Sequence, residues 1–233
     1  MDFRDRHVVI TGGTGALGTA VVAELLANGA ICHVPYYIDQ EEQNFAHRAH
    51  PRVKLIGGAN LASQTVVTRL YDGIPKLWAS IHLAGGFAAS PVADTDEAEL
   101  MGMIRTNLVT SFLCCAAAVR AIRRGGGGGR IVNVSARPAL MPHLGAGSAA
   151  YAASKAGVAS LTQSLAGEVL AENIFVNAIA PSIMDTEANR RAMPKADFTT
   201  WPKVAEVASV ICQLASPENR LTSGAIIPVY GRA

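Results

Sequence analysis

The 233-residue sequence has little charge and few aromatic side chains, and its charges nearly cancel. Only 16% of the residues are charged, 6% are aromatic, and the net charge is +2. Such a chain has no strongly basic or acidic character that would point to a nucleic acid or a membrane surface, so we expect neither partner. Half of the residues are hydrophobic, which excludes a disordered chain and supplies a large core.

The sequence also lacks an apolar run of the roughly 18–20 residues that a membrane-spanning helix needs. The longest candidate, Ser111–Ile122, contains Arg120 and fits a buried helix better. The first seven residues carry charges of both signs and no signal-peptide core. These absences predict a cytoplasmic protein.

Cysteine is scarce, and the four cysteines form no C-x-x-C pair. No histidine lies near them at a spacing typical of metal ligands. All four lie in apolar stretches, so we expect buried, reduced thiols and no metal site; a catalytic or metal-bound thiol is the less favoured alternative. They are Cys32, Cys114, Cys115 and Cys212.

Short apolar runs alternate with helical patterns along the whole chain, without a linker or a break in composition. Strands are expected at 7–11, 30–34, 53–56, 77–83, 130–135, 174–180 and 225–229. Helices are expected at 16–28, 40–48, 61–71, 96–124, 149–171 and 203–215. Apolar strands without polar alternation are typical of a parallel sheet covered on both faces. This predicts one α/β domain over residues 1–233, a Rossmann-type three-layer αβα sandwich with a seven-stranded, mainly parallel sheet.

The first expected strand runs directly into the glycine-rich segment Thr11–Gly18, and a helix follows at once. Glycines let the backbone turn sharply and approach a pyrophosphate, which the free N–H groups of the helix N-terminus then bind. The segment predicts a dinucleotide site that includes Gly12, Thr14, Gly15, Ala16, Leu17 and Gly18.

The acidic residue that binds the adenosine ribose is expected about 20 residues further on. Tyr36 is the best-aligned residue there, and Asp39 lies slightly late. No Lys or Arg is placed to bind a 2′-phosphate. The sequence therefore leaves NAD(H) and NADP(H) as alternative cofactors.

Tyr151 and Lys155 are spaced so that both lie on one face of the expected helix 149–171. An ammonium group beside a phenol favours the phenolate and lowers its pKa. A tyrosine tuned in this way can exchange a proton with a carbonyl or alcohol oxygen. Together with the upstream dinucleotide loop, this pair predicts an oxidoreductase.

At this point the whole chain resembles the short-chain dehydrogenases/reductases. The glycine loop is similar, although Ala16 stands where a glycine is usual. Asn60 replaces the family's Asp, and Leu83 replaces its Asn. The other resembling segments are Leu61, Ala84-Gly85, Asn107, Tyr151 with Lys155, Pro181–Thr186 and Thr222–Gly231.

The resemblance implies a role for each matching residue. Tyr151 and Lys155 would be the catalytic pair, and Asn107 would support Lys155 through a water molecule. Lys155 would also bind the nicotinamide ribose, and Thr186 the nicotinamide amide. Further cofactor contacts are implied at Tyr36, Asn60, Leu61, Ala84, Gly85, Gly86, Tyr151, Pro181 and Ile183.

One departure concerns the serine that usually hydrogen-bonds the substrate oxygen. The register of Asn133-Val134-Ser135-Ala136 puts Ala136 at that position. Ser135 is then a strand-end residue, although a rescued catalytic serine stays an alternative. Ser148 is another candidate, but its position before the expected helix 149–171 favours a capping role.

The missing serine and the stretch Asp185–Trp201 resemble dihydropteridine reductases in particular. Residues 187–202 would form a substrate lid, in which Phe198 and Trp201 either cover a flat heterocycle or anchor the segment to the core. The resemblance implies a pteridine-like or other conjugated substrate. A carbonyl or alcohol dehydrogenase and a non-catalytic dinucleotide sensor are the alternatives.

The expected helices 107–124 and 149–171 are apolar beyond one stripe. Excess apolar helix surface predicts a partner. In the family that the chain resembles, these helices pair between subunits, which implies a homo-oligomer, a tetramer or a dimer.

Overall fold

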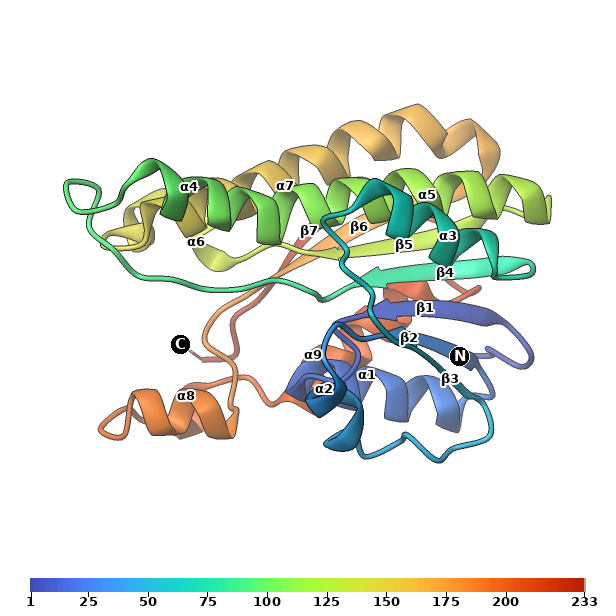
Figure 1. Ribbon diagram of the computed structural model, residues 1–233, viewed down its shortest axis with the longest axis horizontal. Helices are drawn as coiled ribbons and strands as arrows, with labels where there is room; N and C mark the ends of the chain where they lie inside the picture. The colour runs from blue at the N-terminus through green and yellow to red at the C-terminus, as the bar shows by residue number, and fades with distance from the viewer. Residues whose placement is uncertain (233) are drawn as a thin grey trace.

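A computed structural model describes residues 1–232 and contains one parallel sheet of seven strands (Figure 1). The sheet order is β3-β2-β1-β4-β5-β6-β7, and every neighbouring pair is parallel. The predicted seven-stranded, mainly parallel sheet is therefore confirmed. The strands are β1 (His7–Thr11), β2 (Ile31–Pro35), β3 (Val53–Ile56), β4 (Leu77–His82), β5 (Gly129–Val134), β6 (Ile174–Pro181) and β7 (Ile226–Val229).

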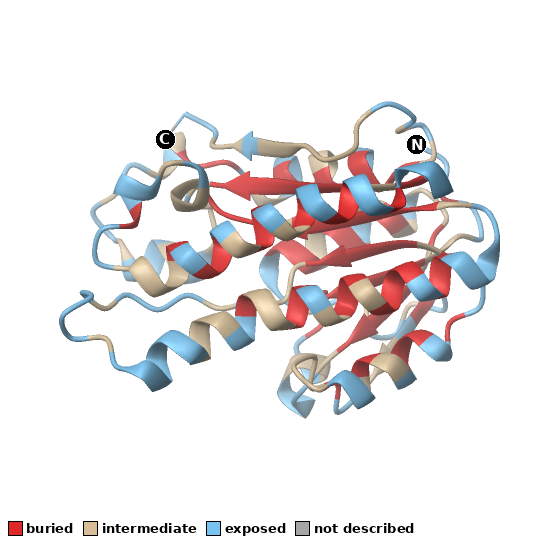
Figure 2. Ribbon diagram, turned by 90° about the horizontal axis from the view of Figure 1, so that it is seen from above, coloured by how far each residue is buried: buried red, intermediate tan, exposed pale blue. Residues whose placement is uncertain are grey.

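Helices cover both faces of the sheet, as Figure 1 shows, and this confirms the three-layer architecture. One face carries α1 (Ala16–Ala27) and α9 (Val204–Ala215). The opposite face carries α3 (Gln64–Asp72), α5 (Thr110–Gly125) and α7 (Ala149–Val169). Buried residues fill the inner strands of the sheet and the inward sides of these helices, whereas the edge strand β7 has no buried residue (Figure 2). Each face thus has its own apolar core.

The shorter elements lie at the helix ends and around the carboxyl edge of the sheet. Their bounds are α2 (Asp39–Gln43), α4 (Glu97–Met103), α6 (Arg137–Leu140) and α8 (Glu187–Ala192). The π-helical turn η1 (Ile104–Val109) joins α4 to α5, and three 3₁₀ turns complete the list: η2 (Pro142–Gly145), η3 (Leu170–Glu172) and η4 (Phe198–Thr200).

Several predicted boundaries were wrong by a few residues. The helix expected at 40–48 is only five residues long, because its polar sequence has no buried face. The helix expected from residue 61 begins at Gln64, because the Asn60 carboxamide accepts the N–H of Ala62 at 3.1 Å and holds a turn. Helix 96–124 is one continuous helical segment with a π turn around Asn107.

This continuous segment, Glu97–Gly125, is by length and composition apolar enough to cross a membrane. Its inward side packs on the sheet through residues such as Cys114, Ala118 and Ile122, which belong to the core beneath α3 and α7. We therefore interpret it as a core helix.

All four cysteines are buried and unpaired by disulfides. Burial raises the pKa of Cys32, Cys114 and Cys115 to about 12, so these thiols are protonated and unreactive near neutral pH. No group of three or more metal-binding side chains occurs among residues 1–232.

A polar network is enclosed between β4, β5 and the helices above them. His82 Nε2 lies 2.8 Å from Ser80 Oγ, and His82 Nδ1 lies 2.8 Å from Asn133 Oδ1. The hydroxyl of Tyr71 lies 2.7 Å from Ser80 Oγ. Burial lowers the pKa of His82 to about 4, so its imidazole is neutral at physiological pH.

Because His82 is buried in this network, the free energy of unfolding is expected to depend on pH. The unfolded chain protonates His82 near its ordinary pKa of about 6.5, whereas the folded chain does so only near 4. We therefore expect His82 to remove up to about 1.4 kcal/mol from the free energy of unfolding per pH unit between these values as the pH falls. Urea unfolding at several pH values should show a shallower acid dependence for His82→Asn than for the wild type. Equal slopes for the two proteins would contradict this expectation.

Candidate active site

The glycine loop joins β1 to α1 and folds back on itself. Gly12 has a φ of +65°, and Gly15 N–H donates to the Gly12 carbonyl at 3.1 Å. A Cβ at Gly12 would lie 2.7 Å from the backbone nitrogen of Ala84. The loop therefore requires glycine here, because any side chain would collide with the segment after β4.

A cleft of about 470 Å³ lies over this loop, at the carboxyl ends of β1, β2 and β4. In a doubly wound sheet, dinucleotides bind at this edge, where the strand order reverses. The cleft brings together seven of the predicted cofactor residues: Gly12, Thr14, Gly15, Tyr36, Leu61, Ala84 and Gly85.

Gly18 is not among the residues that line the cleft. It is buried in α1 beneath the loop, and a Cβ there would lie 2.2 Å from the Gly12 carbonyl oxygen. Leu17 is buried as well. Ala16 and Asn60 also lie outside the cleft lining. Gly18 therefore shapes the loop from below and does not touch the cleft.

The adenosine end of the cleft contains a carboxylate that the sequence analysis missed. Glu41 lines the cleft, and its Oε2 accepts the N–H groups of Tyr37 at 2.7 Å and Ile38 at 3.3 Å. The hydroxyl of Tyr36 donates to Glu42 at 2.6 Å, and this hydrogen bond raises the pKa of Tyr36. The acidic first turn of α2, which contains Asp39, Glu41 and Glu42, was the sequence feature that could have indicated this carboxylate.

Lys155 lies at the centre of the second part of the site. Its ammonium donates to the Val134 carbonyl at 2.9 Å, and its side chain is buried. A Cβ at Gly85 would lie 3.2 Å from Lys155 Nζ and 2.6 Å from Asn107 Oδ1. Burial lowers the pKa of Lys155 to about 8.

Asn107 holds the π turn η1 against the segment after β4. Its carboxamide accepts the N–H of Gly86 at 2.9 Å and donates to the Gly86 carbonyl at 3.1 Å. It also donates to Ser154 Oγ at 3.0 Å, which links it to the helix of Lys155. The structure therefore brings together Asn107, Lys155 and Gly85, which the resemblance singles out as site residues.

Tyr151 lies one turn before Lys155 on α7, with its ring edge-to-face against Phe87 at a centroid distance of 5.0 Å. Burial raises the pKa of Tyr151 to about 12. This direction is opposite to the expected lowering by Lys155. Among residues 1–232, no hydrogen bond joins the two side chains, because the ammonium is held by the Val134 carbonyl instead.

Ser135 is turned into the protein. Its side chain is buried and its hydroxyl donates to the Lys155 carbonyl at 2.8 Å, so it ties the end of β5 to α7. Ala136, in extended backbone, follows it and is also buried. Ser148 precedes α7, but its side chain makes no capping hydrogen bond. The expected cap is therefore absent.

The segment after β6 holds the remaining predicted residues. Pro181 is buried at the end of β6, and Ile183 is exposed. The hydroxyl of Thr186 caps α8 by accepting the N–H of Asn189 at 3.2 Å. These three residues lie outside the cleft lining, so the structure does not join them to the glycine loop.

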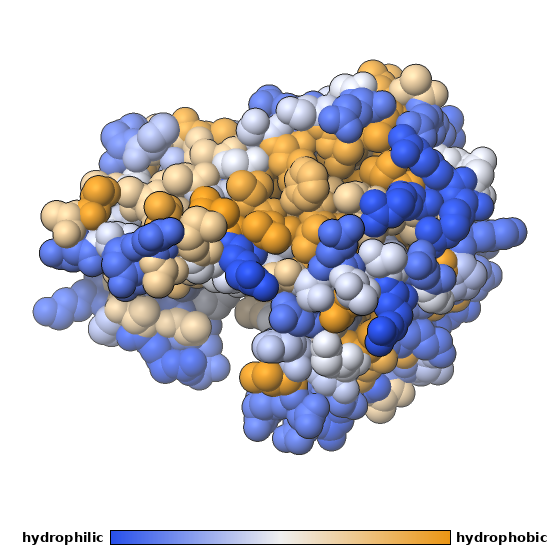
Figure 3. Space-filling view, turned by 45° about the horizontal axis from the view of Figure 1, so that its top comes forward, coloured by the Kyte–Doolittle hydropathy of each residue, from blue (hydrophilic) through white to orange (hydrophobic). Residues whose placement is uncertain are grey.

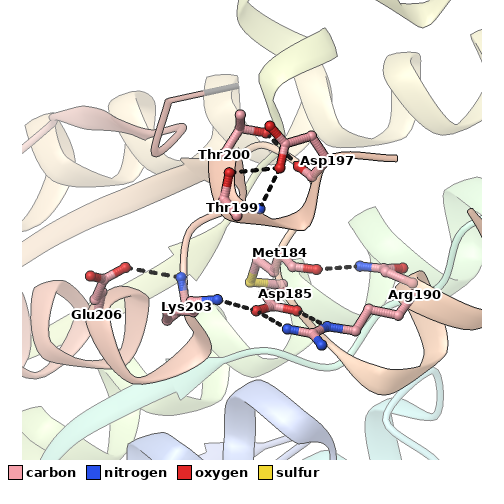
Figure 4. A network of polar contacts seen from close by, with 9 residues as sticks. Met184, Asp185, Arg190, Asp197, Thr199, Thr200, Lys203 and Glu206 are labelled. Carbon is pink, nitrogen blue, oxygen red and sulfur yellow. Dashed lines mark hydrogen bonds and ion pairs between the residues drawn. The ribbon is translucent and has the colours of Figure 1, made fainter. Parts of the chain in front are cut away.

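Asp185 closes the base of the segment 187–202 (Figure 4). Its carboxylate is only 6% exposed and accepts Arg190 Nε at 2.5 Å and Arg190 Nη2 at 2.8 Å. It also pairs with the Lys203 ammonium, at the other end of the segment. The two cations hold the pKa of Asp185 well below its usual range, so the pair persists over the physiological pH range. Trp201 is buried, which anchors the segment to the core.

Comparisons with known proteins agree with this architecture and site. Residues 6–197 match the model of the short chain dehydrogenase family. The chain is 31% identical to 3beta-hydroxysteroid dehydrogenase 1 of Eggerthella lenta over 99% of this chain and 94% of that protein. It is 29% identical to the 3-oxoacyl-(acyl-carrier-protein) reductase MabA of Mycobacterium tuberculosis over 98% and 93% of the two chains.

Solved structures share the same fold. A short-chain type dehydrogenase/reductase from Mycobacterium ulcerans superimposes with a TM-score of 0.90 at 24% identity, over 100% of this chain and 90% of that one. The structure of ElxO with NADP bound superimposes with a TM-score of 0.88 at 23% identity, over 97% and 98% of the two chains. The family match over residues 6–197 and the full-length relatives lead to one conclusion. The chain belongs to the short-chain dehydrogenase/reductase family of NAD(P)-dependent oxidoreductases.

Proposed function

We propose that this enzyme reduces a conjugated carbonyl or imine substrate, with Tyr151 as proton donor. One observation carries the proposal: Gly85 lines the dinucleotide cleft and also packs against Lys155 and Asn107. The cofactor cleft and the Tyr151–Lys155 pair are therefore parts of one site. A nicotinamide cofactor bound there supplies the hydride.

The residues present fit such a cofactor. The backbone of the glycine loop and the N-terminus of α1 would hold the pyrophosphate, because no side chain fills the space above Gly12 and Gly15. Glu41 lines the adenosine end, and no Lys or Arg among residues 1–232 lines the cleft. A carboxylate suits a ribose 2′-hydroxyl and repels a 2′-phosphate, so we propose that NADH is preferred to NADPH.

The chain's own groups favour the reductive direction. Burial keeps the Tyr151 hydroxyl protonated at neutral pH, so it can donate a proton to the substrate oxygen or nitrogen as the hydride reaches the adjacent carbon. Lys155 is cationic below about pH 8 and stabilises the negative charge that Tyr151 then acquires. Asn107 positions Lys155 through the segment after β4.

The substrate class follows from the missing serine. The Ser135 hydroxyl is engaged by the Lys155 carbonyl, and Ala136 offers no donor. Losing an oxyanion-type donor commonly lowers the rate by about 10²–10³, so a simple ketone is a poor substrate. A conjugated acceptor such as a quinonoid pterin needs less polarisation. The relatives reported above are named for steroid and oxoacyl substrates, so the pteridine assignment rests on Ala136 and on the Asp185–Trp201 stretch.

Two other functions compete with this proposal. A dehydrogenase of ordinary carbonyls or alcohols would need another donor to polarise the substrate oxygen. A non-catalytic dinucleotide sensor would have no use for Asn107, Tyr151 and Lys155 together.

The test is stopped-flow oxidation of NADH and of NADPH with three acceptors: a quinonoid dihydropterin, a 3-oxosteroid and a simple ketone. We expect fast NADH oxidation with the conjugated acceptor and slow oxidation with the ketone. Tight NADH binding without oxidation by any acceptor would support the sensor instead. Fast reduction of the simple ketone would contradict the inference that the alanine at position 136 restricts the enzyme to conjugated substrates.

In this proposal the chain forms one domain over residues 1–233, and the segment 187–202 acts as its substrate lid. Asp185 fixes the base of this lid. Asp185→Asn removes the charge that holds Arg190 and Lys203 together. We expect the KM for the acceptor substrate to rise about three- to tenfold with little change in kcat. Glu187→Gln is the matched control, because it removes an exposed pair with Arg191 on the same segment. Steady-state kinetics of both variants measure the two KM values. An equal rise of KM in both variants would contradict the role of Asp185 at the base of the lid.

We also propose a cytoplasmic homo-oligomer, a tetramer or a dimer. Phe112 on α5 is 55% exposed, and Leu100 and Met101 on α4 are exposed as well. Apolar side chains gather over α5 and α7 in Figure 3. Light scattering at micromolar concentration should give a multiple of the 24.3 kDa chain mass, and Phe112→Glu should lower it. A monomeric wild-type mass would contradict this.

A further inference from the structure

Arg137 stands directly after Ala136, the residue at the position of the family's serine, and begins α6. Its guanidinium carbon lies 4.8 Å from the centre of the Tyr230 ring, just beyond β7. Its Nε is buried without a hydrogen-bond partner. It is the one buried side-chain nitrogen or oxygen of this kind within residues 1–232.

A buried N–H of a charged group is costly to leave without an acceptor. Buried polar groups in folded proteins are nearly always hydrogen-bonded, and the exceptions call for a functional explanation. The side chain of Arg137 also forms no ion pair with the acidic groups of residues 1–232. The lid arginines Arg190 and Arg191 are instead paired with Asp185 and Glu187.

Other arginines of this chain show what the same edge of a guanidinium binds. Arg123 directs Nε and Nη2 at the two carboxylate oxygens of Glu172, each at 2.6 Å. Arg190 holds Asp185 through the same two nitrogens. Nε and Nη2 form a parallel pair of donors that matches a carboxylate. In Arg137 the guanidinium lies over the Tyr230 ring, and its Nε donor has no acceptor among residues 1–232.

The position of Arg137 links the two sides of the substrate region. On one side, a Cβ at Gly145 would meet Ala152, next to Tyr151, at 2.8 Å and Pro138, next to Arg137, at 3.6 Å. On the other side, Ser182 Oγ donates to the Tyr230 carbonyl at 2.8 Å, between the end of β6 and the lid segment. Arg137 therefore lies between the catalytic helix and the base of the lid.

We propose that Arg137 binds a carboxylate of the substrate through its Nε and Nη edge, and so makes the enzyme selective for oxo acids. The inference rests on the proposed function, because it assumes that the substrate lies between Tyr151 and the lid.

The test compares pairs in which the ester lacks the negative charge of the acid: phenylglyoxylate with its methyl ester, and acetoacetate with its methyl ester. The variants are Arg137→Met, which keeps the length of the side chain, and Arg137→Lys, which keeps the charge without the fork. Arg52→Met removes an arginine–carboxylate pair that lies away from the site and serves as control. NADH binding and the thermal midpoint are measured for each protein.

In the wild-type enzyme, kcat/KM is expected to favour at least one acid over its ester by tenfold or more, depending on where the carboxylate lies. Arg137→Met should reduce this ratio by about tenfold to a hundredfold, and Arg137→Lys by less. Arg52→Met should not change it. A wild-type ratio near one for both pairs, or the same ratio in Arg137→Met, would overturn the inference.

A binding measurement separates this inference from the proposed function. If NADH binds but no compound is reduced, the proposed function fails. Quenching of the fluorescence of enzyme-bound NADH then measures the affinity for each acid and ester without turnover. Tighter binding of an acid that is lost in Arg137→Met would still support the carboxylate site, and equal binding of both forms would overturn it.

Discussion

Tyr151→Phe should lower the turnover number by about 10²–10⁴, the loss typical of a removed acid–base group. Phenylalanine keeps the ring that packs edge-to-face on Phe87, so the site should stay folded while the proton donor is removed. Single-turnover oxidation of enzyme-bound NADH with the best acceptor from the panel measures this loss. NADH affinity should be unchanged within about threefold, because the hydroxyl makes no contact with the adenosine end of the cleft.

Ser135→Ala is the matched control for this loss of turnover. The Ser135 hydroxyl donates to the Lys155 carbonyl and not to the side of the site that holds Tyr151, so its removal should change turnover little. The free energy of unfolding should fall by about 1 kcal/mol for the lost hydrogen bond. If Ser135→Ala abolished activity on any good substrate, Ser135 would be the catalytic serine after all.

Gly18→Val should weaken nucleotide binding by about an order of magnitude or more. A Cβ at Gly18 would lie 2.2 Å from the Gly12 carbonyl oxygen and 2.5 Å from the Gly13 Cα, so the loop must move away from α1. The loop would then no longer present its N–H groups to the pyrophosphate. Calorimetric titration with NADH measures the affinity.

Gly127→Val is the control for added bulk, because nothing lies within 4 Å of a Cβ at this position on the α5–β5 connection. It should bind NADH as the wild type does. Loss of stability in Gly18→Val is expected as well, since crowding a packed interior destabilises by about 1–3 kcal/mol. Unchanged NADH affinity in a folded Gly18→Val protein would contradict the role of this residue.

The strands were predictable because parallel strands buried on both faces are apolar over their whole length. All seven expected ranges agree with the structure within one residue at each end. Helix limits were less predictable. The helix expected at 40–48 ends at Gln43, since polar residues alone do not reveal where packing support stops.

Within the site, the Tyr151–Lys155 spacing was sufficient to place both residues on one helix. The spacing did not predict the direction in which the pKa of Tyr151 shifts. That direction depends on burial and on the Val134 carbonyl, which holds the Lys155 ammonium. Glu41 was not predicted as a site residue because its position also depends on the tertiary structure. The alignment pointed to Tyr36, whereas the turn of α2 brings a later carboxylate to the cleft.

The sequence by itself determined the order of strands and helices, the glycine loop and the family, because these depend on residues close together in the chain. The tertiary structure alone decided which polar groups meet: Asp185 with Lys203, Arg137 with Tyr230, and Ser135 with the Lys155 carbonyl. These partners are 18 or more residues apart, and neither hydropathy periodicity nor motif spacing encodes such a distance. These contacts determine the protonation state of each titratable side chain in the site through burial and hydrogen bonding. They also fix the orientation of each side chain.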